Sequence, residues 1–221
     1  MNRTGIDHAV PYTAVVMTRG DGKLEKAYPL PEGYRFAAFT PENEENWIRL
    51  QLAVTHVESY AQGKQIFREE FLQAGEEIPC GDCPGYAETV RRTVLIKDAA
   101  DTLVGVATLW TGDTFGKTWQ RVHWVAVHPD HQGRGLAKCL IARMLQMYEE
   151  WNCHGPIYLT TQTKTYRAVR VYAQLGFVPY LGEKPANWPF RSDLPKESFA
   201  QENEAAWQLI RQKLAEAKLS M

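Results

Sequence analysis

The stretch "VHWVAVHPDHQGRGLAKCLIARML" (122–145) constrains the fold of this chain more than any other. A β-like run ends at Pro129, and two glycines, Gly133 and Gly135, then lead directly into a helical pattern. From Ala137 onward, apolar residues recur at three- and four-residue steps, which is typical of a helix packed along one side. A helix N-terminus exposes unpaired amides and a partial positive charge, and glycines there let a ligand approach the main chain. We therefore expect a ligand that carries a pyrophosphate at this turn.

Two common phosphate-binding motifs do not match this turn. The dinucleotide fingerprint, GxGxxG, would place its third glycine where Lys138 stands. That fingerprint also follows its strand closely, whereas five residues separate the strand from Gly133 here. A Walker loop, GxxxxGK[ST], occurs nowhere in the chain. A glycine-rich helix entry without any ligand stays open as the alternative.

The composition indicates a globular protein whose anion sites are local. The 221 residues are 44% hydrophobic and 23% charged, with a formal net charge of −1, so no overall field attracts nucleic acid or an anionic membrane. The apolar runs are far shorter than the roughly 20 residues of a membrane span. The N-terminal segment lacks the apolar centre of a secretory signal. We therefore expect a cytoplasmic protein with no nucleic-acid and no membrane partner.

The order of the expected elements indicates an α/β fold with a mixed sheet. Thr40 is expected as an N-cap with Pro41 in the first helical position, and Gly176 as a C-cap. The patterns predict strands at 13–18, 34–39, 92–98, 102–110, 121–127, 155–161 and 178–182, and helices at 40–54, 64–73, 135–151, 165–176 and 201–219.

The chain is expected to hold one main domain with two extensions. Residues 1–33, with a turn at Gly20, Asp21 and Gly22, are expected to form an N-terminal extension or an edge hairpin. The main domain is expected at 34–182, and a C-terminal extension with a helix at 183–221. That helix would either close the domain or form the contact of a homodimer.

The cysteines and loop histidines do not predict a metal site. Cys80 and Cys83 have the spacing of half a zinc site, but no second ligand pair completes it. A polar loop with two thiols is favoured over a redox pair or a loop disulfide, and Cys139 is expected in the core. His128 and His131 are expected as solvated loop residues, and they would point away from His123 on the strand.

Two motifs together resemble those of the GCN5-related N-acetyltransferase (GNAT) superfamily. "VAVHP" followed by "QGRGLA" (125–137) resembles the acetyl-CoA signature Q/R-x-x-G-x-G/A of that family. "RVYAQLGF" (170–177) resembles its later tyrosine motif, with Tyr172 four residues before Gly176. The resemblance covers about residues 34–181. It implies a GNAT-like, mixed and mostly antiparallel sheet flanked by helices, with acetyl-CoA as the acetyl donor.

The resemblance also implies roles by motif position. The strand before the loop splays from its neighbour, and the pantetheine arm lies in the gap. The main chain of Val125 and Val127 would bind that arm, with the Val125 amide on the thioester oxygen, while Tyr172 would give a proton to the departing thiolate. The cofactor-binding residues implied in this way are Val125, Ala126, Val127, Gln132, Gly133, Arg134, Gly135, Leu136, Ala137, Lys138, Thr165 and Arg170.

His123 is the expected base, with a water chain as the alternative. It stands two residues before Val125, so the period of two in a strand places both side chains on one face and Trp124 on the other. An imidazole with a pKa near 6.5 can take a proton at neutral pH. The spacing resembles the strand histidine of arylalkylamine-type acetyltransferases. A core histidine and a packing tyrosine remain the structural alternatives for His123 and Tyr172.

The chain departs from the family pattern at three positions. Thr160 and Thr161 stand where many relatives carry a glutamate, and Thr165 stands where many carry an asparagine. A base on that strand, and a side-chain contact to the pantetheine, are therefore in doubt. No cysteine lies where an acetyl-enzyme would form, so direct attack in a ternary complex is expected.

The expected function is transfer of an acetyl group to a primary amine of a small molecule. A protein or peptide N-acetyltransferase and a non-catalytic acyl-CoA-binding domain are the alternatives. The two early helices and the loop 75–85 are expected to wall the acceptor side. Candidate contacts to the acceptor are Glu58, Asp113, Trp124 and "NWPF" (187–190).

Overall fold

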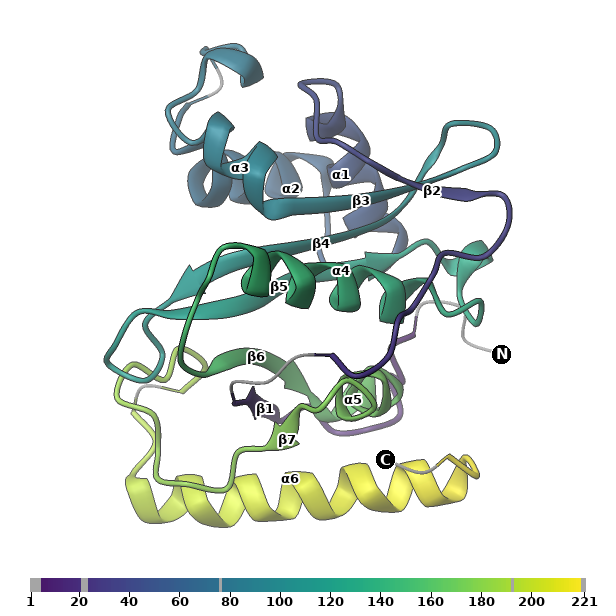
Figure 1. The fold of residues 1–221 in the computed structure, drawn as a ribbon. Helices are drawn as coiled ribbons and strands as arrows, with labels where there is room; N and C mark the ends of the chain where they lie inside the picture. The colour runs from purple at the N-terminus through teal and green to yellow at the C-terminus, as the bar shows by residue number, and fades with distance from the viewer. Residues whose placement is uncertain (1–4, 21–23, 76, 192, 220–221) are drawn as a thin grey trace.

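The structure, a computed structural model that describes residues 5–20, 24–75, 77–191 and 193–219, is built around a seven-stranded sheet (Figure 1). In space the strands follow the order β2-β3-β4-β5-β6-β1-β7. Every neighbouring pair is antiparallel except β5 and β6, which run parallel, so the expected mixed and mostly antiparallel sheet is confirmed. The strands are β1 (Ala14–Arg19), β2 (Tyr34–Ala37), β3 (Thr93–Asp98), β4 (Leu103–Gly112), β5 (Trp119–Val127), β6 (Ile157–Gln162) and β7 (Val178–Pro179).

Helices cover both faces of this sheet, because successive strand residues point to opposite sides. In β3, Val94 and Ile96 belong to the main core with α4, α5 and α6, whereas Leu95 belongs to a second core with α1 and α2. Figure 1 shows α1, α2 and α3 grouped together, with α6 at the opposite end of the molecule. The helices are α1 (Asn43–Ala53), α2 (Tyr60–Phe67) with a π-helical continuation (Arg68–Leu72), α3 (Tyr86–Arg92), α4 (Leu136–Glu150), α5 (Tyr166–Ala173) and α6 (Lys196–Glu216).

The early helices differ from their predicted bounds. The first begins at Asn43 rather than Pro41, and Thr40 uses its carbonyl oxygen, not its side chain, to accept from the Asn43 amide at 2.9 Å. The second begins before the expected residue 64, because the Ser59 hydroxyl caps it by accepting from the Gln62 amide at 3.1 Å. Helix α3 was missed, since its seven residues form less than two full turns of apolar pattern.

Strand β1 is an inner strand of the sheet rather than an edge hairpin. It pairs with β6 along six residues on one side and with β7 on the other. Val15 and Met17 are fully buried in the main core. Of the expected turn that follows, Asp21 and Gly22 lie outside the described residues.

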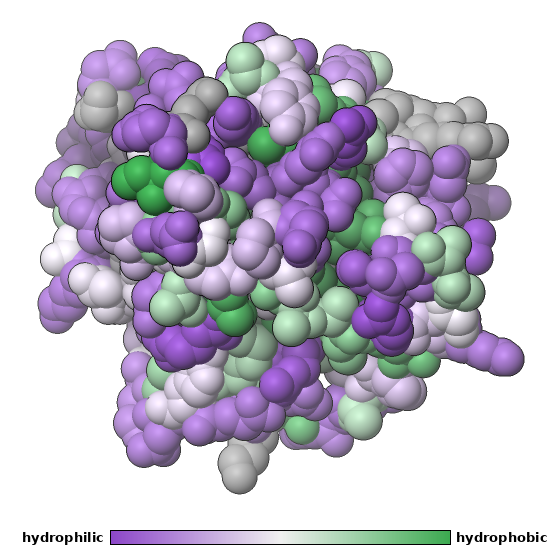
Figure 2. Space-filling view, turned by 90° about the horizontal axis from the view of Figure 1, so that it is seen from above, coloured by the Kyte–Doolittle hydropathy of each residue, from purple (hydrophilic) through white to green (hydrophobic). Residues whose placement is uncertain are grey.

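Helix α6 closes the main core of this chain. Trp207, Ile210 and Leu214 lie on one face of the helix, as the sequence predicts, and all three are buried in the same cluster as the residues of α4 and α5. Among the described residues, no helix has the length and apolar character that crossing a bilayer requires. Hydrophilic residues predominate on the face seen in Figure 2, and apolar ones appear there in small, separate areas.

The sheet parts between β5 and β6. These two strands pair only at Gln120 with Ile157 and at Arg121 with Tyr158. From there β5 continues beside β4 as far as Val127, while β6 continues beside β1. The main chain of β5 beyond Arg121 therefore has no strand neighbour on the β6 side.

We expect Trp207→Ala to lower the free energy of unfolding by about 3–5 kcal/mol, because it removes a fully buried indole from the core. Urea unfolding followed by circular dichroism measures this change. Gln208→Ala is the matched control on the exposed face, with an expected change within about 0.5 kcal/mol. Equal stabilities of the two variants would contradict a core role for α6.

Candidate active site

The turn between β5 and α4 presents unpaired main-chain amides. Gly133 and Gly135 have φ values of 76° and 83°, in the left-handed region that favours glycine, and a Cβ on either would meet no atom within 4 Å. Among the described residues, the amides of 133–137 have no recorded hydrogen-bond partner. The Lys138 amide differs, because it donates to the Gly135 carbonyl at 3.0 Å. Five amides at the mouth of α4 are thus available to an anion.

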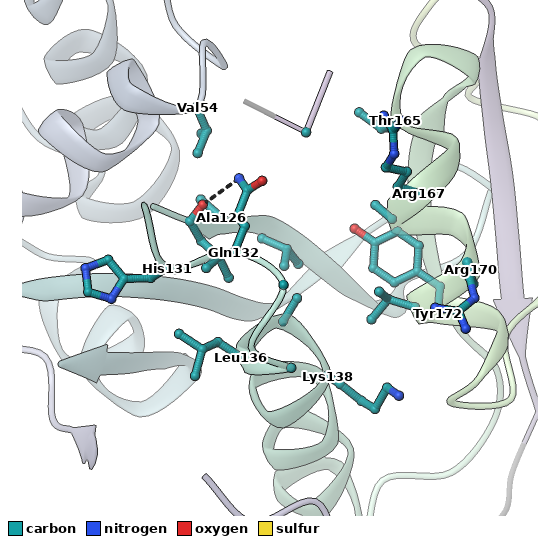
Figure 3. A pocket seen from close by; sticks show the side chains of 18 of the residues that line it. Val54, Ala126, His131, Gln132, Leu136, Lys138, Thr165, Arg167, Arg170 and Tyr172 are labelled. Atoms are coloured by element: carbon teal, nitrogen blue, oxygen red, sulfur yellow. Dashed lines mark hydrogen bonds between the residues drawn. The ribbon is translucent and has the colours of Figure 1, made fainter. Parts of the chain in front are cut away.

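A cavity of about 510 Å³, which we call the donor cavity, extends from this turn to β5 and α5 (Figure 3). Every residue that the sequence implied for cofactor binding lines it except Arg134, which is exposed and points its guanidinium at the Asp130 carbonyl. Lys138 from α4 and Arg170 from α5 bring positive charge to the lining. Arg167, which the sequence analysis missed, adds a third cation one turn before Arg170.

A second cavity, of about 250 Å³, adjoins the donor cavity and is called the acceptor cavity here. It is lined by the parting ends of β5 and β6, including Arg121, His123 and Thr160. The two cavities meet at residues that line both, which are His56, Val125, Thr165, Ala168 and Tyr172. A molecule in one cavity can therefore contact a molecule in the other at this junction.

Tyr172 places a protonated phenol at the junction. The side chain comes from α5 and is 9% exposed, and burial raises the pKa of Tyr172 to about 12. In Figure 3 the phenol projects from the helix into the cavity. At neutral pH this group is a hydrogen-bond donor that still holds its proton.

A bulge in β5 changes the expected directions of its side chains. Ala107 of β4 faces both Trp124 and Val125, and Trp124 adopts a left-handed φ of 47°. His123 and Trp124 consequently reach the same carboxylate: the His123 Nε2 and the Trp124 Nε1, the latter at 2.9 Å, both bond to Glu70. The prediction that Trp124 points away from the face of His123 is therefore wrong.

Glu70 and His123 form a buried pair. Burial lowers the pKa of His123, and this effect outweighs the hydrogen bond to Glu70, which raises it. Burial opposes the ionisation of Glu70, yet the bonds from His123 and Trp124 bring the pKa of the carboxyl below its usual value. At neutral pH we assign a neutral imidazole that donates from Nε2 to a carboxylate, which leaves Nδ1 as the proton acceptor.

A family model described as the acetyltransferase (GNAT) family matches residues 54–177. The chain belongs to the GNAT acetyltransferase family. The mycothiol acetyltransferase of Actinosynnema mirum is 30% identical to it over 168 residues, which cover 73% of this chain and 50% of that protein. The L-amino acid N-acyltransferase MnaT of Escherichia coli is 29% identical over 103 residues, or 43% of this chain and 58% of that protein. The GNAT chain thus spans about half the length of these two relatives.

Solved structures agree on the GNAT fold. A GCN5-related N-acetyltransferase from Sphaerobacter thermophilus aligns with a TM-score of 0.55 at 18% identity, over 76% of this chain and 48% of that one. A tandem GNAT protein from the clavulanic acid biosynthesis pathway aligns with a TM-score of 0.51 at 16% identity, over 79% and 52% of the two chains. At these identities the likeness shows the fold alone.

His56 and Glu70, like Arg167, are residues of this GNAT site that the sequence analysis missed. His56 follows α1 and lines both cavities, and its Nδ1 lies 2.7 Å from the Gln51 side-chain oxygen. The protein atoms that crowd this ring lower the pKa of His56, although much of its surface opens onto the cavities. Glu70 lies 53 residues before its partner His123. No local spacing in the sequence signals either residue.

Several polar side chains near the GNAT site are already engaged. The Gln132 amide nitrogen donates to the Val127 carbonyl at 3.0 Å and ties the loop to the end of β5 (Figure 3). The Thr165 hydroxyl lies 2.8 Å from that of Thr161 and donates to the Gln162 carbonyl at 2.9 Å. The structure thus gives both side chains a local role beside any contact to a ligand.

The two loop histidines lie in different surroundings. His131 is not a solvated residue, because its Nδ1 lies 2.9 Å from the Tyr34 hydroxyl and its ring lines the donor cavity. His128 is more exposed and accepts a hydrogen bond from the Asp130 amide at 3.3 Å.

The CxxC segment lies in the second core and not in a polar loop. Cys80 and Cys83 are buried, and burial raises the pKa of both thiols, that of Cys80 to about 12. Neither thiol is therefore a reactive nucleophile. None of the described residues of the loop 75–85 lines either cavity, and neither do Glu58 and Asp113. Trp124 and Phe190, from the other candidate contacts, do line the acceptor cavity.

We expect Glu70→Gln to lower the pKa of His123 further, because the carboxylate that favours the imidazolium is lost while the burial stays. NMR titration of the histidine ring protons measures this shift, and the spectrum of His123→Ala identifies the signal. Glu69→Gln, on an exposed neighbour, is the control and should leave the titration unchanged. A pKa that rises in Glu70→Gln would contradict the pairing.

Proposed function

We propose that this chain is an acetyl-CoA-dependent N-acetyltransferase that acts on a primary amine of a small molecule. The observation that carries the proposal is the junction of the donor and acceptor cavities at Tyr172 and Val125. One side of the junction leads to the unpaired amides of residues 133–137. The other side contains His123 with its carboxylate partner.

The donor cavity suits coenzyme A, which supplies the acetyl group as an activated thioester. The amides at the mouth of α4, with Lys138 and Arg170, match the charge of a diphosphate. The open edge of β5 beyond Arg121 offers main-chain groups to an extended arm such as pantetheine. Arg134 and the side chain of Thr165 contribute less than the family resemblance implies, since both are engaged or directed elsewhere.

His123 in the acceptor cavity and Tyr172 at the junction can accept and donate the protons of an acyl transfer. The amine of the acceptor must lose a proton before its nitrogen attacks the acyl carbon, and His123 can take that proton directly or through water. As the C–N bond forms and the C–S bond breaks, the Tyr172 hydroxyl can donate a proton to the departing sulfur. No cysteine lines either cavity among the described residues, which favours direct attack in a ternary complex.

The size of the acceptor cavity favours a small molecule over a protein segment. Its volume is only about 250 Å³, and it lies where β5 and β6 part. The relatives named mycothiol acetyltransferase and L-amino acid N-acyltransferase support the same class. The presence of Tyr172 at the junction and of His123 in the acceptor cavity argues against a non-catalytic acyl-CoA-binding domain.

Isothermal titration calorimetry with acetyl-CoA tests the donor site. We expect the wild-type chain to bind, and Gly135→Val to bind at least about tenfold more weakly, because a β-branched residue is strained at a φ of 83° and its side chain would project beside the free amides. Gly155→Val is the control at another glycine of positive φ, away from both cavities. A wild-type chain that is folded and gives no heat with acetyl-CoA would end the proposal.

We expect Tyr172→Phe to lower kcat about 100-fold with little change in the KM for acetyl-CoA, because a positioned proton donor is lost while the ring is kept. Release of the coenzyme A thiol with a panel of amines measures the rate. Tyr60→Phe, exposed on α2, should keep full activity. Retention of full kcat in Tyr172→Phe would remove the phenol as the acid.

A further inference from the structure

Arg121 lies at the point where the sheet parts, at the base of the acceptor cavity. It is the last residue of β5 that pairs with β6, in register with Tyr158, and it lines the cavity. Its Nη2 donates to the Thr160 hydroxyl at 3.0 Å, which is the one hydrogen bond recorded for this guanidinium among the described residues. Its Nε is buried without any partner. Most of the donor capacity of this side chain is thus unused.

No acid lines the acceptor cavity beside this charge. Its lining holds Arg121, His56 and His123 but no aspartate or glutamate. Glu70, behind His123, is close enough for the charge of Arg121 to help lower the pKa of its carboxyl, but it already accepts bonds from two ring nitrogens. No ion pair to Arg121 is recorded in the part of the chain that the structure describes. Because a guanidinium keeps its charge at all working pH values, this cavity holds a permanent cation that can bind an anion.

We infer that Arg121 binds the carboxylate of the acceptor, so that the acceptor is an amino acid and not a simple amine. The inference rests on the proposed function, because it names the acceptor class of the same site. A guanidinium and a carboxylate match in a planar, two-point contact. With its carboxylate at Arg121, the acceptor can extend its amine along β5, where His123 is two residues and about 7 Å further on. The amine then lies near the junction with the donor cavity.

The rest of the lining indicates what kind of amino acid fits. The buried amide oxygen of Gln162, which has no partner, can accept from an N–H of the acceptor. Tyr12 and Phe190, at 53% and 40% exposure, stand at the rim, and Trp124 lies further in. These aromatic rings suit an apolar or aromatic side chain of the acceptor.

Matched pairs of acceptors test this inference on the full chain. Phenylalanine is compared with phenethylamine, and leucine with 3-methylbutylamine, because each pair differs only by the carboxylate. Release of the coenzyme A thiol gives kcat/KM for each compound. We expect the amino acid of each pair to be favoured at least about tenfold, the worth of a charge-assisted hydrogen bond. Equal values within each pair would overturn the inference.

The variant Arg121→Met tests the residue itself. We expect KM for the amino acids to rise at least about tenfold, while the decarboxylated amines keep their kcat/KM. Arg121→Lys keeps the charge without the planar fork, and its KM for the amino acids should lie between those of the wild-type chain and Arg121→Met. Arg49→Met, on an exposed arginine of α1, is the control. A similar loss for both members of each pair would assign Arg121 a structural role and overturn its role in recognition.

The outcomes separate this inference from the proposed function. Acetylation of the simple amines with no advantage for the amino acids would refute the inference alone. If acetyl-CoA binds but no acceptor in the panel causes release of the coenzyme A thiol, the proposed function is refuted and the inference with it. If Arg121→Met does not fold, the kcat/KM values of each amino acid and its decarboxylated amine still test the inference on the wild-type chain and on Arg121→Lys.

Discussion

The loss of pairing between β5 and β6 after Arg121 is the constraint on which the rest of the molecule depends. Two residue pairs join the strands, and beyond them each strand follows a different neighbour. The gap creates both cavities and exposes one edge of β5 to them. A main chain buried without partners would be costly, so a gap of this kind is stable where ligands or water can satisfy its polar groups.

Strand β5 connects the turn with free amides to the pair of His123 and Glu70. Its end leads into the turn with free amides, and its bulge directs His123 and Trp124 to one carboxylate. A regular strand would have placed these two side chains on opposite faces. The bulge therefore lets a single strand hold the pair of His123 and Glu70 while its following residues line the donor cavity.

A feature could be predicted from the sequence where neighbouring residues in the chain determine it, and not where distant packing does. The glycine turn predicted the mouth of α4 because its conformation is set by Gly133 and Gly135 themselves. The bulge at Trp124 was not predictable, since it arises from the register with β4. Glu70 and Arg121 escaped notice for the same reason: their roles come from what packs beside them and not from any motif. Thus the donor side was readable and most of the acceptor side was not.

Strand β6, on one side of the gap, is stabilised mainly by elements outside the segment that the family model matches. The family model covers 54–177, whereas β1 is formed by 14–19 and α6 by 196–216. Strand β6 pairs with β1 along its whole length but with β5 at only two positions. A fragment trimmed to residues 54–177 would therefore leave β6 as a bare edge, open to pairing with other chains and prone to aggregate.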